Sequence, residues 1–235
     1  MESNDGLRSH QMKLAIIAAT GGVGEQLLRQ ALGAGHDVTA VVRNPAKLPA
    51  ALRDTRIVSA DLASPQPGAL EAAIAGTDAV LSGLGPASNS SAGIATRGTR
   101  AIAAAMDATG VKRLVVISAA PVGTMPSPGR PAPPKHDPGE GYIMRHLGTP
   151  IARAAFGKVY ADLATMEDLL RDSDLDWTAV RPPKLTNKPL TTHYRTATGQ
   201  NVHGGWSVPR ADVAHLMLAV LGRPETIGQV IGIAS

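Results

Sequence analysis

A glycine-rich turn near the start of the chain has the residue types and spacing that hold phosphate groups. Residues 18–24 read AATGGVG; they follow an apolar, β-branched run at 13–19 and precede apolar side chains at helical spacing over 23–34. The turn therefore joins a predicted strand to a predicted helix. The first N–H groups of a helix have no intrahelical partner and, with the helix dipole, they attract anions. The pattern indicates a phosphate site, and the alternative is an ordinary strand-to-helix turn.

A second strand, predicted at residues 37–42, completes a βαβ unit and favours a dinucleotide as the phosphate ligand. In such units an acidic residue at the end of the second strand binds the ribose 2′-hydroxyl of NAD, whereas arginine accommodates the 2′-phosphate of NADP. This strand leads into Arg43, and Lys47 follows in the first turn of a short helix predicted at 45–53. A planar guanidinium and a second positive charge favour NADP(H) over NAD(H), unless both side chains are only solvated surface charges.

Further apolar runs alternate with helical patterns along the rest of the chain. A parallel strand needs a long crossover to its neighbour, usually a helix. The sequence thus predicts an α/β, three-layer, doubly wound Rossmann fold with a mostly parallel, seven-stranded sheet, in a single domain over 12–235 that follows a flexible tail at 1–11. The additional strands are predicted at 56–62, 78–85, 112–118, 175–181 and 229–234, and the additional helices at 67–75, 91–109, 158–173 and 210–221.

Composition excludes several classes of function. The chain has 235 residues and no cysteine, which excludes disulfides and thiol nucleophiles, and its histidines lack metal-ligand spacing, so we expect no metal site. The net charge is +4, but the basic residues are dispersed and aromatic residues make up 3%, so we do not expect nucleic-acid binding. A polar N-terminus without long apolar runs predicts neither a signal peptide nor a membrane span, and we expect a cytoplasmic protein.

Strand ends carry the remaining candidates for binding, because ligands of open α/β sheets lie outside the carboxyl ends of the strands. Asp61 and Leu62 end the third strand, and the Asp61 carboxylate either accepts from an adenine amino group or caps the segment after it. The run Gly83-Leu84-Gly85 ends the fourth strand, and its bare backbone lets a ribose or nicotinamide approach closely. Ser118 ends the fifth strand and is expected to face the same crevice.

Six motifs, in order along the chain, carry a family resemblance: AATGGVG, VVRNPAKL, SADL, LSGLG, RLVVISA and LLRDSDLDWTAVRPP. Together they resemble the atypical short-chain dehydrogenase/reductase superfamily, and within it the NAD(P)H-binding group that contains biliverdin-IXβ reductase/flavin reductase and NmrA-like proteins. The resemblance spans residues 13–234 and implies the role of each candidate. Pyrophosphate would be held by Thr20, Gly21, Gly22, Val23 and Gly24, the 2′-phosphate by Arg43 and Lys47, adenine by Asp61 and Leu62, the ribose side by Gly83, Leu84 and Gly85, and the nicotinamide by Ser118 and by the backbone of Pro182, Pro183 and Lys184.

The turn departs from the family pattern at one position. The family usually has glycine where this chain has Ala18. An alanine methyl is tolerated there only at negative φ, so we expect a reduced affinity for the cofactor.

An irregular segment at residues 119–157 contains recurring prolines as far as Pro138. Prolines prevent regular structure, and a loop of this length inside a compact domain is usually functional. Its last part, 142–156, has helical character with a basic side, and a second polar, turn-rich segment lies at 184–205. We expect these segments to form a lid over a small-molecule substrate or, for the first, the interface of a homodimer.

Ser118 and Tyr160 are the candidate catalytic residues. Typical short-chain dehydrogenases place a lysine four residues after the catalytic tyrosine to lower its pKa, but here that place holds Ala164, and Lys158 precedes Tyr160 by two positions. Tyr160 is therefore either a proton donor or a packed amphipathic tyrosine. Hydride transfer does not require such a pair, because the cofactor supplies the reactivity and solvent can supply the proton to a flavin, quinone or similar ring.

These features predict an NADPH-dependent oxidoreductase that transfers hydride to a small conjugated or carbonyl acceptor. The missing tyrosine–lysine pair leaves two alternatives open. One is an NmrA-like regulator that senses NADP(H) without turnover and presents the proline-rich segment to a protein. The other is an isomerase or cyclase that uses the bound cofactor structurally.

Overall fold

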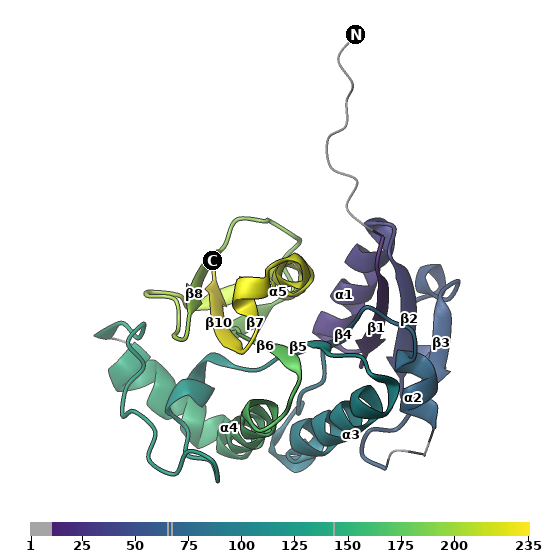
Figure 1. Cartoon of the computed structure of the whole chain (residues 1–235). Coiled ribbons are helices and arrows are strands. Elements are labelled where there is room, and N and C mark those ends of the chain that lie inside the picture. The colour runs from purple at the N-terminus through teal and green to yellow at the C-terminus, as the bar shows by residue number, and fades with distance from the viewer. Residues whose placement is uncertain (1–10, 65, 67, 143) are drawn as a thin grey trace.

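The structure is a computed structural model (Figure 1), which describes residues 11–64, 66, 68–142 and 144–235. The tail predicted at 1–11 lies outside the described residues except for Gln11. Pro67, the predicted first residue of a helix, lies outside them as well.

The main sheet of the described chain has eight strands in the order β3-β2-β1-β4-β5-β6-β10-β8. Every neighbouring pair except β10 and β8 is parallel, which confirms the predicted doubly wound α/β Rossmann fold. The seven predicted strands are all present, as β1 (Lys13–Ile17), β2 (Asp37–Val42), β3 (Arg56–Ser59), β4 (Ala79–Ser82), β5 (Arg113–Ile117), β6 (Asp176–Arg181) and β10 (Gln229–Ala234).

The sequence pattern does not reveal the other three strands. The eighth strand of the sheet, β8 (Arg195–Thr198), pairs antiparallel with β10, so the predicted count of seven is one too low. Its residues, RTAT, are mostly exposed, and no apolar run marks them. β7 (Lys184–Thr186) and β9 (Ser207–Pro209) pair in parallel as a separate ribbon. All three form through hydrogen bonds to partners distant in sequence.

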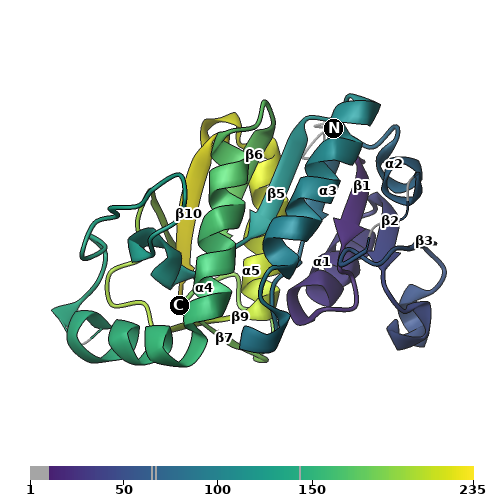
Figure 2. The ribbon, with the colours of Figure 1, turned by 90° about the horizontal axis from the view of Figure 1, so that it is seen from below.

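Helices cover both faces of the main sheet. Figures 1 and 2 show α1 and α5 on one face, with α2, α3 and α4 on the other. The bounds are α1 (Gly22–Gly33), α2 (Ala69–Ile74), α3 (Ile94–Thr109), α4 (Thr149–Arg171) and α5 (Arg210–Ala219).

Two predicted helices differ from the observed backbone. The helix predicted at 45–53 is wrong, because this stretch forms two 3-10 turns, Pro45–Lys47 and Ala50–Leu52, separated by Pro49, which has no N–H to continue a helix. The helical segments predicted at 142–156 and 158–173 are joined, since a π-helical turn, Met144–Gly148, leads into α4. Within α4 the backbone leaves helical geometry at Phe156, where φ is −130° and ψ is 24°.

The core is divided by the sheet into two layers, and β1 shows how. Successive side chains of a strand point to opposite faces. Leu14 and Ile16 accordingly pack in the cluster that contains the apolar residues of α1 and α5, whereas Ala15 and Ile17 pack in the cluster that contains those of α2, α3 and α4. Because both faces are covered, the edge at the carboxyl ends of the strands is left to bind ligands.

None of the helices in the described residues is both long enough and apolar enough to span a membrane.

Candidate functional site

Three backbone segments meet at the glycine turn that follows β1. Gly21 is the N-cap of α1, no side chain caps the helix, and the Glu25 N–H donates to the Gly21 carbonyl at 2.8 Å. A Cβ added to Gly24 would lie 2.1 Å from the Ala18 carbonyl oxygen, and one added to Gly83, at the end of β4, would lie 2.8 Å from the Gly24 nitrogen. The helix N-terminus is therefore approached by bare backbone on two sides, a cradle that fits a pyrophosphate.

Ala18 adopts the left-handed conformation that the sequence argument excludes for alanine. Its φ is +57°, and its carbonyl still accepts the Gly21 N–H at 2.8 Å. The condition of negative φ is therefore wrong, and the turn forms with an alanine in the place of the family glycine. The methyl group adds a backbone strain of about 1 kcal/mol instead of preventing the turn.

Arg43 and Lys47 lie just beyond β2, beside the glycine turn's own strand, and both are exposed. Between them the Asn44 side chain accepts from the Ala46 N–H at 3.0 Å, which fixes the start of the 3-10 turn that carries Lys47. The two basic side chains are thus placed at the carboxyl edge next to the cradle. Their role toward a 2′-phosphate stays a prediction.

Asp61 and Leu62, the residues predicted to flank adenine, each contact other parts of the chain. Asp61 is exposed, and its Oδ1 accepts from the Ala63 N–H at 3.0 Å, as the capping alternative requires. Leu62 is buried in the core layer of α2, α3 and α4. A Cβ on Gly98 of α3 would lie 2.3 Å from Leu84 Cδ2 and 3.5 Å from Leu62 Cβ, so the two leucines pack over that glycine. The Leu62 side chain therefore stabilises α3, whereas Asp61 is free to meet solvent or a ligand with its remaining oxygen.

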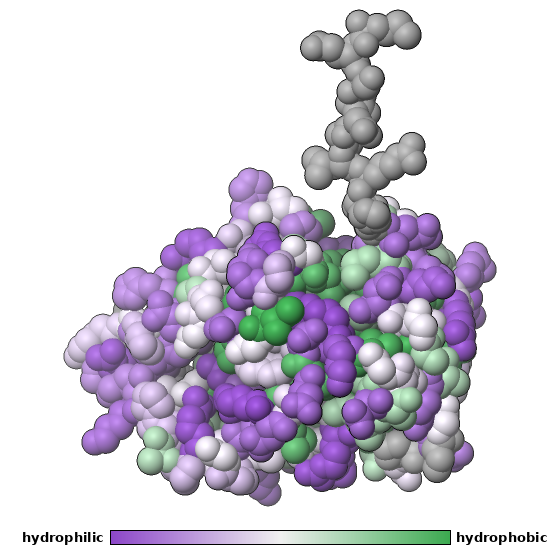
Figure 3. Space-filling model, in the orientation of Figure 1, coloured by the Kyte–Doolittle hydropathy of each residue, from purple (hydrophilic) through white to green (hydrophobic). Residues whose placement is uncertain are grey.

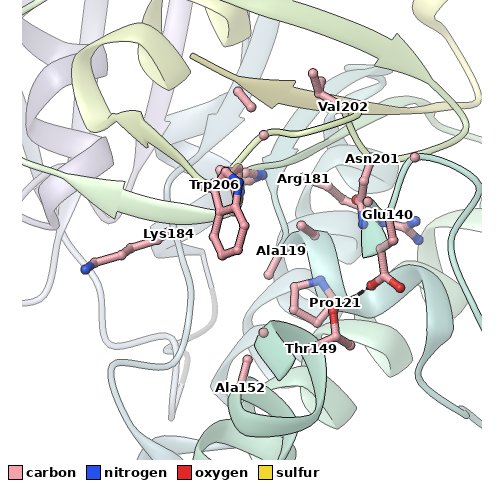
Figure 4. A pocket seen from close by; sticks show the side chains of 18 of the residues that line it. Ala119, Pro121, Glu140, Thr149, Ala152, Arg181, Lys184, Asn201, Val202 and Trp206 are labelled. Atoms are coloured by element: carbon pink, nitrogen blue, oxygen red, sulfur yellow. Dashed lines mark hydrogen bonds between the residues drawn. The ribbon is translucent and has the colours of Figure 1, made fainter. Parts of the chain in front are cut away.

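A cavity of about 540 Å³ opens at the carboxyl ends of β5, β6 and β10. Figure 4 shows the Trp206 ring, Pro121 and Ala152 around the same space, and apolar groups form most of the wall. Hydrophobic residues also gather near the centre of the face seen in Figure 3, between hydrophilic ones. Pro182, Pro183 and Lys184 line the cavity directly after β6. Much of the remaining lining comes from the segments predicted as a lid, 119–157 and 184–205.

Asp137 connects the two lining segments. It is buried, and its Oδ1 accepts from the N–H groups of Gly139 and Asn201, both at 2.9 Å. A Cβ on Gly139 would lie 1.7 Å from the Asn201 carbonyl oxygen, so only glycine permits this approach. One carboxylate thus holds two segments, far apart in sequence, as adjoining walls of the cavity.

Few polar groups face the cavity. Glu140 is buried in its wall and accepts from the Thr149 hydroxyl at 2.6 Å (Figure 4), and Arg181 and Tyr160 also line it. Burial raises the pKa of the Tyr160 phenol, so the group is protonated at neutral pH. A neighbouring lysine would instead lower the pKa of the phenol. Tyr160 can donate a proton or a hydrogen bond, but none of the described residues lowers the pKa of its phenol to activate it as a base.

The Ser118 hydroxyl points into a buried charge cluster. Its Oγ donates to Glu167 at 2.7 Å, and Glu167, which is 0% exposed, also accepts from Arg181 Nε at 2.8 Å and from Arg171 at 2.9 Å. Ser118 does not belong to the cavity lining, whereas its neighbours Ala119 and Ala120 do. Its role at a nicotinamide stays a prediction, and any such contact would share the hydroxyl with Glu167.

Sequence reasoning missed several residues of this site. Glu140, Trp206 and Arg181 line the cavity, and Arg210 lies against the glycine turn. The glycines on both sides of Glu140 were a local signal, whereas Trp206 precedes β9, a strand that the sequence pattern does not reveal. Within the described residues, no group of histidine, aspartate and glutamate side chains is arranged to hold a metal ion.

One family model matches most of the chain, and the match includes the glycine turn. The family model described as NAD(P)H-binding matches residues 18–224, from the turn almost to the last strand. The chain belongs to this NAD(P)H-binding family. The resemblance of the six motifs is thereby confirmed at the level of the family.

Solved structures similar to this family member share its fold across nearly the whole chain. A short-chain dehydrogenase/reductase from Veillonella parvula DSM 2008, in complex with NADP, is 17% identical with a TM-score of 0.76, covering 95% of this chain and 94% of that one. The oxidoreductase ylbE from Lactococcus lactis is 20% identical (TM-score 0.73; 95% and 91%). A proposed NADH-flavin reductase from Streptococcus pneumoniae TIGR4 is 23% identical (TM-score 0.71; 95% and 99%).

Proposed function

We propose that this protein is an NADPH-dependent reductase that passes a hydride to a small, planar, conjugated acceptor. The observation that carries the proposal is that the glycine cradle and the apolar cavity lie on one sheet edge. The cradle follows β1 and β4, the cavity follows β5 and β6, and the strand order places these four side by side. At a strand spacing of ~4.8 Å the two sites are separated by about 10 Å, a span that one dinucleotide bridges.

The residues present fit the cofactor along this edge. Gly21, Gly22 and Gly24 offer a bare helix N-terminus to the pyrophosphate, and the backbone after β4 and β6 leads toward the cavity. When bound, NADPH supplies the hydride. The chain's contribution is to orient the acceptor between apolar walls and to keep water from it.

The preference for the 2′-phosphate rests on Arg43 and Lys47. Both are exposed next to the cradle, and the carboxylate that would bind a ribose 2′-hydroxyl is not at the end of β2. The NADP complex of the Veillonella protein supports the same cofactor on the same fold. The Streptococcus protein's name indicates NADH, which makes the choice worth testing directly.

The character of the cavity supports a ring-shaped acceptor. Trp206, Phe156 and Tyr160 give aromatic surfaces, and the volume of about 540 Å³ is in the usual range of small-molecule sites. Such rings accept hydride without a strong acid, which fits a site that lacks a tyrosine–lysine pair. The flavin-reductase description of the Streptococcus protein points in the same direction.

Steady-state oxidation of NADPH with a panel of acceptors tests this proposal. We expect saturable turnover with a flavin or a quinone and much slower turnover with a simple aldehyde. Tight NADP(H) binding without turnover on any acceptor would reject the reductase and favour the NmrA-like regulator. That second candidate is supported by one observation, the engagement of the Ser118 hydroxyl by Glu167 at 2.7 Å. Conversion of a substrate with no net change in NADPH would instead indicate an isomerase or cyclase.

A further inference from the structure

Arg210, the first residue of α5, lies against the first residue of α1. A Cβ added to Gly22 would lie 2.7 Å from Arg210 Nε and 2.8 Å from Arg210 Cδ. The arginine can therefore occupy this place only because residue 22 has no side chain. The absence of a side chain at Gly22 thus makes room for a guanidinium, a need that the phosphate-site pattern of the sequence does not show.

The position of Arg210 is set by the packing of the two helices. α1 and α5 share one core layer, and the Gln30 side chain of α1 donates to the Ala211 carbonyl at 2.8 Å. Arg210 Nη1 donates to the Asn187 side-chain oxygen at 2.6 Å. Asn187 follows β7, in a segment that is attached to α5 by the buried Asp212, which accepts from Thr191 and Thr192.

Within the part of the chain that the structure describes, the Arg210 guanidinium has an amide partner but no ionic one. Among the described residues, no carboxylate forms a salt bridge with Arg210, and the nearest in sequence, Asp212, accepts hydrogen bonds on both oxygens from the segment after Asn187. The N-terminus of α1, which attracts anions, lies beside it. An arginine placed over an uncapped helix N-terminus without a counter-ion is well suited to a doubly charged ligand.

We propose that Arg210 binds the pyrophosphate of NADP(H) as a clamp over the glycine turn. Its guanidinium exchanges the neutral Asn187 amide for a charged oxygen, while the backbone of the turn binds the opposite side of the same group. Gly22 is required because it admits this side chain. The clamp rests on the proposed function, since it presumes a nicotinamide dinucleotide in the cradle.

Calorimetric titration separates the clamp from the 2′-phosphate site with two ligands. NADP⁺ contains both the pyrophosphate and the 2′-phosphate, whereas adenosine 2′-monophosphate contains only the latter. We expect Arg210→Ala to weaken NADP⁺ at least tenfold and adenosine 2′-monophosphate less than twofold. Arg43→Ala is expected to weaken both. Arg29→Ala, which removes an equal charge from α1, serves as the control and is expected to change neither.

Gly22→Ala provides a second, independent variant. Its Cβ displaces the guanidinium, so we expect Gly22→Ala to lower NADP⁺ affinity more in the wild-type background than in the Arg210→Ala background, where only its effect on the backbone cradle remains. Arg210→Lys keeps the positive charge but loses the planar guanidinium that donates two parallel hydrogen bonds, so we expect an intermediate affinity for NADP⁺. This variant replaces Arg210→Ala if Arg210→Ala fails to fold.

Unchanged NADP⁺ affinity in Arg210→Ala, or equal losses for the two ligands, overturns the clamp and leaves the proposed function standing. Tighter NADP⁺ binding by Arg210→Ala also overturns it, because Arg210 would then obstruct the cradle. A wild-type protein that binds no nicotinamide nucleotide overturns both proposals.

Discussion

The two ends of the ligand-binding edge are built in different ways. The cradle after β1 and β4 is made of consecutive backbone, and its requirements are local: Gly24 and Gly83 are needed where a Cβ would collide with main-chain atoms. The cavity after β5 and β6 is made of side chains from segments far apart in sequence, which Asp137 holds together. The first end is specified by the sequence pattern, the second by tertiary contacts.

Because of this difference, the backbone cradle is expected to stay constant among related proteins, whereas the cavity can vary. A pyrophosphate presents the same charges in every nicotinamide nucleotide, so a rigid backbone site serves all of them. An acceptor differs from enzyme to enzyme, and a cavity lined by loops can change without disturbing the sheet. Substitutions at each end should therefore have separable effects on cofactor binding and on acceptor binding.

Gly24→Ala should have the largest effect. The added Cβ would lie 2.1 Å from the Ala18 carbonyl oxygen, which is backbone and cannot move alone. We expect a loss of about 3 kcal/mol or more in the free energy of unfolding and a loss of NADP⁺ binding, measured by urea denaturation and calorimetry. Gly33→Ala in the same helix is the control, because nothing lies within 4 Å of its Cβ. A small stabilisation is expected there, and equal effects at both positions would contradict the close approach.

Glu167→Gln should be next, and it tests the buried charge cluster that supports the cavity end. The carboxylate is 0% exposed and pairs with Arg181, which is 3% exposed and lines the cavity. Removing its charge leaves the buried guanidinium uncompensated, so we expect a loss of about 3 kcal/mol in the free energy of unfolding. Glu25→Gln, at the partly exposed pair with Arg29, should cost less than about 1 kcal/mol. Similar costs for the two variants would show that burial does not set the strength of the Glu167 cluster.

Ala152→Phe should affect the acceptor end alone. Ala152 faces the cavity from α4 (Figure 4), so a larger side chain fills space that the acceptor needs. We expect KM for the acceptor to rise about tenfold, which corresponds to ~1.4 kcal/mol, without a change in the Kd of NADP⁺. Ala154→Phe, on an exposed position of the same helix outside the cavity lining, should change neither. A weaker NADP⁺ affinity in Ala152→Phe would mean that the two ends are not separate.

Ala18→Gly should have the smallest effect and the opposite sign. With φ at +57°, the alanine is strained, and glycine removes the strain at the cost of a more flexible unfolded chain. We expect a net stabilisation of about 0.5 kcal/mol, seen as a higher Tm. Ala104→Gly, on an exposed position inside α3, should instead destabilise by about 1 kcal/mol. Destabilisation of Ala18→Gly would argue against a left-handed residue 18.

The same contrast explains what the sequence could predict. The parallel strands and most helices follow from hydrophobic periodicity, because each buries a face in one of two core layers. β8 escapes prediction because its RTAT residues are mostly exposed and join the sheet by pairing with β10, which is distant in sequence. Asn201 carries no local signal, since its place in the cavity wall depends on its contact with Asp137, 64 residues earlier in the chain. Glu167, which accepts from the Ser118 hydroxyl, lies on α4, 49 residues later in the chain. The sequence pattern therefore does not indicate this contact either.

Calorimetric titration of NADP⁺ and NAD⁺ into the wild-type protein and Arg43→Ala tests the central claim, that this edge binds a nicotinamide nucleotide through a backbone cradle and a 2′-phosphate site. The wild type should bind NADP⁺ more tightly than NAD⁺, and Arg43→Ala should weaken NADP⁺ about tenfold or more while leaving NAD⁺ nearly unchanged. No heat with either nucleotide, or equal losses for both in the variant, would contradict the account.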